Sequence, residues 1–187
     1  MSDIADRYRT RADNFAAVIA AVRPDQWRNQ SPCADWKAVD VVRHIVDMHE
    51  VMLQPLGRSL SPAPPVDDDP MGAFNAARAD IEEVLADPEA ARAEAQTPMG
   101  KMPVEVHIDG VVSADMVLHG WDLAKATGQE YTIPPEEIER AAAMEGAIPD
   151  ELLRPIAFGP RVAVPDDATP QDKLLAFIGR DPNWRPA

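Results

Sequence analysis

The sequence predicts an all-α protein: a four-helix bundle with a long connection between helices 2 and 3 and a short C-terminal cap. Three observations predict this class. Only 9 of the 187 residues are glycine, apolar side chains recur at helical spacing, and the 19 prolines cluster outside the periodic segments. Apolar residues make up 45% of the chain, which is enough for a hydrophobic core.

The first two helices are expected over residues 3–22 and 36–54. Within the first, Tyr8, Phe15 and Ile19 are spaced so that they lie on one helical face. A proline-containing segment then interrupts the periodicity. Asp35 has the side chain of a helix N-cap, and we expect it to begin the second helix.

The third and fourth helices are expected over residues 71–95 and 104–127. Residues 55–70, rich in proline and acid, form the long connection before the third helix. A second break separates helices 3 and 4, and Gly128 is a suitable residue to end the fourth. We expect these four helices to form one antiparallel bundle with a crossover.

The C-terminal extension, residues 129–187, is expected to pack as a cap on the bundle, which spans about residues 2–128. Together they would form a single domain over residues 1–187. A short helix begins near Pro134, and residues 161–164 have the composition of an extended segment. Residues 169–172 carry the threonine N-cap, N1 proline and N3 carboxylate of a final helix start.

The acidic balance of the chain argues against nucleic-acid and membrane-surface binding. The formal net charge is −14, and such a surface repels phosphate backbones and anionic lipids. No apolar run has the roughly 20 residues of a membrane helix, and the N-terminus has no export pattern. Cys33 is alone, so no internal disulfide forms. We therefore expect a cytoplasmic protein.

The fourth expected helix carries polar residues within its apolar face. Asp115, His119 and Asp122 lie in the arc that also contains Val111 and Val112. Burial of an ionised carboxylate costs several kcal/mol unless the group is paired or bound to metal. Either a structural ion pair or a metal site would compensate these residues.

The second helix supplies two candidate histidines, His44 and His49, which lie about 140° apart around the helix. They cannot serve one site together, and periodicity alone does not choose between them. One of these imidazoles together with Asp115 and His119 would leave an open position on zinc, nickel or iron(II).

Three segments carry a family resemblance: residues 31–36, Asp40–Val–Val–Arg–His44, and the stretch from Asp115 through His119 to Asp122. Together they resemble the DinB-like metal-binding superfamily, and within it the mycothiol-dependent maleylpyruvate isomerase group. Residues 172–184 are similar to the C-terminal signature of a small subfamily there. The resemblance implies a four-helix bundle that binds a divalent metal through His44, Asp115 and His119.

The chain departs from the isomerase in two respects. The isomerase has glutamate at the position of Asp115, and we expect its large C-terminal domain to be missing here or replaced by the short tail. The specific isomerase reaction is therefore not carried over to this chain.

Neighbouring polar residues have simpler interpretations. Asp122 has three candidate roles: a fourth metal ligand, a hydrogen-bond acceptor that holds a ligating histidine, or a base. The second is preferred, because a ligating histidine usually donates its other N–H to an acceptor. Asp40, one turn before His44, is a candidate for the same role as an acceptor that holds a ligating histidine. His49 is expected in the core, and His107 lies off the site. Two further residues receive no catalytic role: Trp121, expected to pack, and Cys33, which has no basic neighbour in sequence.

The function implied by the resemblance is that of a thiol-dependent transferase or isomerase. Its cofactor would be a divalent metal, zinc first and nickel or iron(II) next, with mycothiol or a similar thiol as cosubstrate. Its partners would be that thiol and a small electrophile, and the sequence is compatible with a homodimer. The alternative is a non-catalytic metal-binding or stress-response module that acts through a protein partner.

Overall fold

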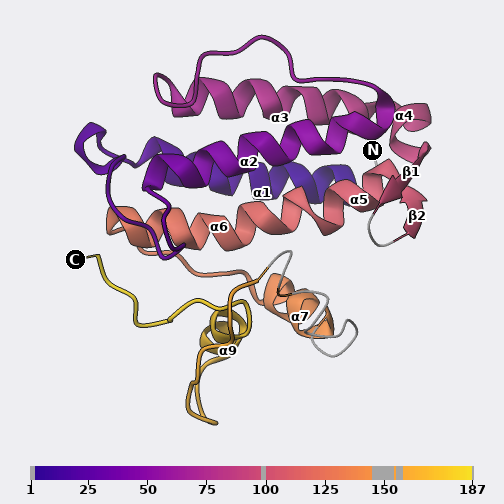
Figure 1. The fold of residues 1–187 in the computed structure, drawn as a ribbon. Coiled ribbons are helices and arrows are strands. Elements are labelled where there is room, and N and C mark those ends of the chain that lie inside the picture. The colour runs from indigo at the N-terminus through magenta and orange to yellow at the C-terminus, as the bar shows by residue number, and fades with distance from the viewer. Residues whose placement is uncertain (1–2, 98–99, 145–153, 155–157, 187) are drawn as a thin grey trace.

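A computed structural model describes residues 3–97, 100–144, 154 and 158–186. Four long helices form a bundle (Figure 1). They are α1 (Asp3–Ala20), α2 (Ala38–Leu53), α3 (Pro70–Ala86) and α6 (Val112–Thr127). Helices α1 and α2 each pack against both α3 and α6, so the four enclose one core. The predicted all-α bundle is confirmed.

The directions of the helices differ from the antiparallel arrangement expected. Gln129, after α6, donates a hydrogen bond to the carbonyl of Val18 at the end of α1 (3.1 Å), so α1 and α6 are parallel. Arg43 early in α2 pairs with Asp67 just before α3, at 2.8 Å, so α2 and α3 are parallel too. The antiparallel expectation is therefore wrong for these two pairs. The long connection, which includes the 3₁₀ turn η2 (Gln54–Leu56), returns the chain to the end of the bundle where α2 began (Figure 1).

The third predicted helix, 71–95, is shorter than expected. Asp87 ends α3 because its carboxylate accepts a hydrogen bond from the backbone N–H of Glu89 (2.9 Å), which caps α4 (Pro88–Arg92). The chain then forms an antiparallel hairpin of β1 (Glu94–Thr97) and β2 (Gly100–Pro103).

The fourth predicted helix, 104–127, is two helices, α5 (Val104–Gly110) and α6. Val111 separates them with φ −113° and ψ −86°, outside the helical range. The start of α2 also differs, because Asp35 has φ 64° and is not its N-cap. A 3₁₀ turn, η1 (Pro24–Gln26), and a short loop precede α2, whose N-cap residue is Lys37.

The described residues after α6 pack beneath that helix as the expected cap (Figure 1). It contains α7 (Pro135–Met144) and α9 (Pro170–Phe177), and the predicted N-cap Thr169 accepts from the N–H of Asp172 at 3.1 Å. Residues 161–164 form no strand, and Val162 instead donates to the carbonyl of Ala176 at 3.0 Å. An apolar cluster joins this cap to α6: Val117, Trp121, Ile133, Leu174, Leu175, Phe177 and Ile178.

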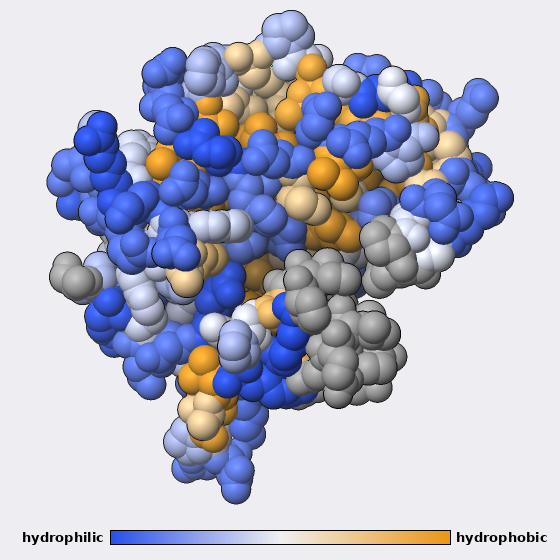
Figure 2. Space-filling view, viewed as in Figure 1, coloured by the Kyte–Doolittle hydropathy of each residue, from blue (hydrophilic) through white to orange (hydrophobic). Residues whose placement is uncertain are grey.

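Most of the surface visible in Figure 2 is hydrophilic, as expected for a bundle whose apolar faces are turned inward. Within the described residues, no helix combines the length and apolar character needed to cross a membrane.

Candidate metal centre

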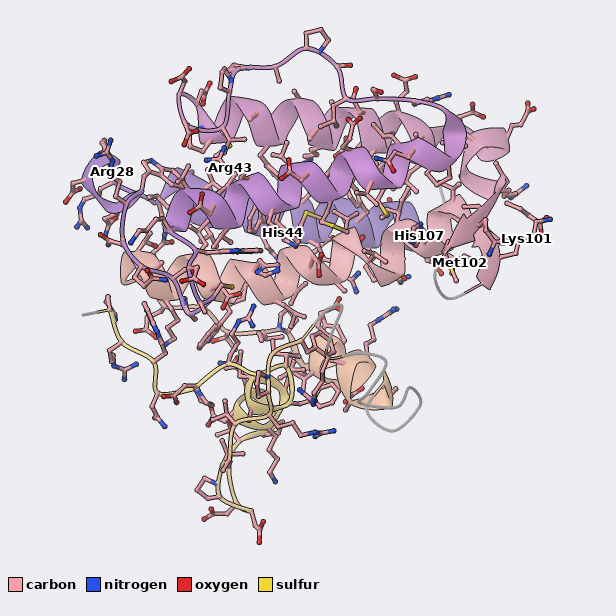
Figure 3. The ribbon with its side chains drawn as sticks, in the orientation of Figure 1. Arg28, Arg43, His44, Lys101, Met102 and His107 are labelled. Atoms are coloured by element: carbon pink, nitrogen blue, oxygen red, sulfur yellow. The ribbon has the colours of Figure 1, made fainter. Side chains whose placement is uncertain are left out.

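The packing of α2 against α6 brings His44, Asp115 and His119 together. The Nε2 atom of His44 lies 3.4 Å from Oδ2 of Asp115, and one candidate ligand atom from each residue lies within 4.8 Å of the others. Figure 3 shows His44 pointing from α2 toward α6. The three residues singled out in the sequence are therefore neighbours, and we refer to them as the triad.

The orientation of His119 is set by Asp122, one turn later on α6. Nδ1 of His119 lies 2.9 Å from Oδ2 of Asp122, and Asp122 is fully buried. Since an ionised carboxylate only accepts hydrogen bonds, Nδ1 carries the proton and Nε2 keeps a free lone pair for the triad. A ligating histidine is commonly held by a carboxylate in this way.

Arg180, from the segment after α9, binds the other side of the same carboxylate. Its Nε donates to Oδ1 of Asp122 at 2.9 Å, and one terminal nitrogen donates to Oδ2 at 3.1 Å. Burial alone would raise the pKa of Asp122, but the hydrogen bond from His119 and the charge of Arg180 outweigh it and lower the pKa to about 2. These contacts favour support over proton abstraction as the role of Asp122.

Cys33 lies beside both Asp122 and His119, with its sulfur 3.9 Å from Nδ1 of His119. Its thiol donates to Oδ2 of Asp122 at 3.1 Å and accepts from Arg180 at 3.0 Å. Burial raises the pKa of this thiol, and the charge of Asp122 raises it further despite the opposing effect of Arg180. Cys33 therefore does have a basic neighbour, brought close by the fold, yet it remains a thiol and a poor nucleophile.

Trp36 contacts both imidazoles of the triad. Its ring centroid lies 5.6 Å from that of His119 in a stacked arrangement and 4.9 Å from that of His44. The indole thus limits the ring orientations open to both histidines. Sequence analysis predicts no role for Trp36 beyond its place in the family motif, because ring stacking leaves no periodic signal.

The structure separates the remaining polar candidates from the triad. Fully buried His49 donates from Nδ1 to the Ile45 carbonyl and accepts from the Tyr8 hydroxyl, so it is a core histidine as expected. His107 lies on α5, well away from His44 (Figure 3). Asp40 accepts from the backbone N–H of Lys37 at 2.8 Å and so caps α2, which explains its place without any link to His44.

The triad has the side-chain types of a divalent-metal site, and one of its donor separations fits zinc. Zinc bonds of roughly 2.0–2.2 Å in a tetrahedral arrangement separate neighbouring donors by roughly 3.3–3.6 Å. The 3.4 Å between His44 and Asp115 falls in this range. The side chains of His44 and Asp115 are each 27% exposed, whereas that of His119 is 11% exposed. The donors therefore converge at the edge of the bundle, with one side accessible to solvent.

These features define a class: helical bundles in which two facing helices hold a candidate metal centre of two histidines and a carboxylate. The chain belongs to the mycothiol maleylpyruvate isomerase N-terminal domain family, whose model matches residues 8–133. The match includes the whole triad, whereas Arg180 lies beyond it. The family predicted from the sequence motifs is confirmed.

Two kinds of relative agree with this assignment. An uncharacterised protein of Mycobacterium tuberculosis, found in two strains, is 35% identical over 170 residues, covering 90% of this chain and 92% of the relative. The crystal structure of a histidine-to-alanine mutant of mycothiol-dependent maleylpyruvate isomerase superposes with a TM-score of 0.51 at 16% identity. It covers 76% of this chain and 68% of that one. At this identity the likeness concerns the fold.

Proposed function

We propose that this protein binds one divalent metal ion through Nε2 of His44, a carboxylate oxygen of Asp115 and Nε2 of His119. Zinc is the ion that we propose first. Nickel and iron(II) suit the same donors and are the alternatives. The observation that carries the proposal is the convergence of these three side chains from two helices, with His119 held by Asp122. Three protein ligands are typical of zinc sites that keep a position for water or substrate.

The proposed activity is that of a thiol-dependent transferase or isomerase. A metal ion at the triad would lower the pKa of a bound thiol, so that a thiolate nucleophile is available at neutral pH. Membership of the mycothiol maleylpyruvate isomerase family supports mycothiol or a similar low-molecular-weight thiol as that cosubstrate. The second substrate is a small electrophile, which the thiol either joins permanently or leaves again after cis–trans isomerisation.

The residues around the triad have separate tasks in this proposal. His44 and Asp115 lie on the solvent-accessible side, where thiol and electrophile can approach. Trp36 covers the two imidazoles and keeps their rings from turning. Asp122 fixes the tautomer of His119, and with three donors already on its Oδ2 it is poorly placed to take a proton from substrate.

Elemental analysis of untagged protein, combined with an assay of mycothiol conjugation to small electrophiles and of cis–trans isomerisation, tests this function. We expect about one metal ion per chain and turnover that disappears with chelation. Metal without turnover over a broad electrophile panel would favour the non-catalytic alternative. Absence of stoichiometric metal would overturn the proposal.

A further inference from the structure

Among the residues that the structure describes, His119 belongs to two clusters of metal-ligand side chains. The triad is one, and the other consists of Cys33, His119 and Asp122, all buried, with one candidate ligand atom from each within 4.8 Å of the others. Cysteine, histidine and aspartate are all established zinc ligands. Because the clusters share one imidazole, a metal ion drawn to the second would compete with binding at the triad.

The guanidinium of Arg180 already occupies the cation position of the second cluster. It reaches both oxygens of Asp122, and the nitrogen that contacts Oδ2 also contacts the sulfur of Cys33 at 3.0 Å. Guanidinium stays protonated under all ordinary conditions, so this positive charge is permanent. It compensates the fully buried carboxylate, a task that would otherwise fall to a metal ion or another cation.

The turn before Arg180 fixes the direction in which its side chain leaves the cap. Gly179 has φ 86°, and a Cβ on this residue would lie 2.7 Å from Cα of Gly159, so glycine is required there. The backbone N–H of Arg180 donates to the carbonyl of Leu175 at 2.8 Å. The end of α9 therefore aims Arg180 at α6 by its own local structure.

We infer that Arg180 is a built-in counter-cation that keeps divalent metal out of the cluster of Cys33, His119 and Asp122 and reserves His119 for the triad. The inference rests on the proposed function, since it presupposes that the triad binds metal. Arg180 acts through Asp122 and His119 and is a positioning residue. It also gives the C-terminal cap, beyond the family match at residues 8–133, a part in selecting the metal site.

Cobalt(II) spectroscopy distinguishes the two clusters, because a cysteine ligand adds a sulfur-to-cobalt charge-transfer band that histidine and carboxylate do not give. Metal-free wild-type protein in thiol-free buffer should bind one cobalt without this band. R180A should bind cobalt with the band, and R180A combined with C33S should lose it again. R180K keeps a cation at this position and should resemble the wild type. C33S alone should leave the wild-type spectrum and affinity unchanged.

R180M, which keeps an apolar side chain, replaces R180A if circular dichroism shows that R180A is unfolded. X-ray absorption of the zinc-loaded wild type adds a measurement that needs no variant, and we expect no sulfur among its ligands. A sulfur ligand in the wild type, a changed spectrum in C33S, or a folded R180A or R180M with the wild-type spectrum would overturn the inference and leave metal binding intact. Failure of the wild type to bind cobalt would overturn the proposed function, and the inference with it.

Discussion

Nδ1 of His119 lies 2.9 Å from Oδ2 of the fully buried Asp122, and this contact determines which imidazole nitrogen is left to face His44 and Asp115. Replacement of Asp122 by asparagine keeps the size of the side chain but removes its charge. We expect D122N to bind zinc about 10–100-fold more weakly, because carboxylates that orient ligating histidines contribute at this level. Competition with a chromophoric chelator measures the affinity. D40N, which alters the cap of α2 and an ion pair with Arg43 but no group of the triad, is the control. Equal weakening in both variants would contradict this role of Asp122.

The ligand assignment predicts that replacing His119 and replacing His107 have different effects on metal content. H119A should lose stoichiometric metal, because only His44 and Asp115 would remain, whereas H107A should keep it, since His107 lies on α5. Elemental analysis after dialysis measures the metal content of both variants. Comparable metal content in the two variants would show that the assignment is wrong.

His49 predicts how stability depends on pH. Burial lowers the pKa of His49 to about 4, against an opposing effect of the Ile45 carbonyl, whereas the unfolded chain has a histidine pKa of about 6.5. Below about pH 6.5 the imidazole of His49 is protonated in the unfolded state, whereas in the folded state it stays neutral until about pH 4. The free energy of unfolding of the metal-free protein should therefore fall by about 3 kcal/mol from this residue as pH drops through that window.

Urea titrations at several pH values test the effect of His49 directly. H49Q lacks the titrating group and should lose less stability between about pH 7 and pH 4 than the wild type. H107Q should keep most of the wild-type slope. Parallel curves for H49Q and the wild type would mean that other groups cause the acid sensitivity.

Metal removal should leave the bundle folded. The core contains fully buried Phe15, Ile45, Phe74 and Ile108, whereas the triad lies at the edge of the bundle. A zinc finger needs its ion to fold because it lacks such a core. We therefore expect chelator-treated protein to keep its helical circular dichroism and to lose only a few degrees of melting temperature. Collapse of the helical signal on chelation would identify a structural metal instead.

Most of the fold was predictable because helical periodicity is a local property. The breaks at Asp87 and Val111 were missed for different reasons. Asp87 followed by Pro88 is a recognisable helix start within the sequence, whereas nothing local distinguishes Val111 from its helical neighbours. The parallel pairs of helices follow from a long connection, since it can return the chain to the same end of the bundle before α3 begins.

The residues of the candidate site were likewise predictable from the sequence only in part. Asp115, His119 and Asp122 were detectable because they share one face of one helix. The choice of His44 over His49 needed the family motif, since both lie near the apolar arc of α2. Arg180 was missed because its contact with Asp122 spans 58 residues and depends on how the cap packs. A lone arginine after an apolar run and a glycine is the only local signal it leaves.

A thiol titration of the cobalt-loaded C33S variant tests the central claim, an open metal position at the triad that accepts a thiol. The C33S background ensures that any sulfur ligand comes from the added thiol. We predict that mycothiol, or a simple thiol used in its place, produces a saturable sulfur-to-cobalt band. The same titration of C33S combined with H119A should produce none. A cobalt spectrum in C33S that does not respond to thiol at any concentration would contradict the account and mean that the metal position is closed.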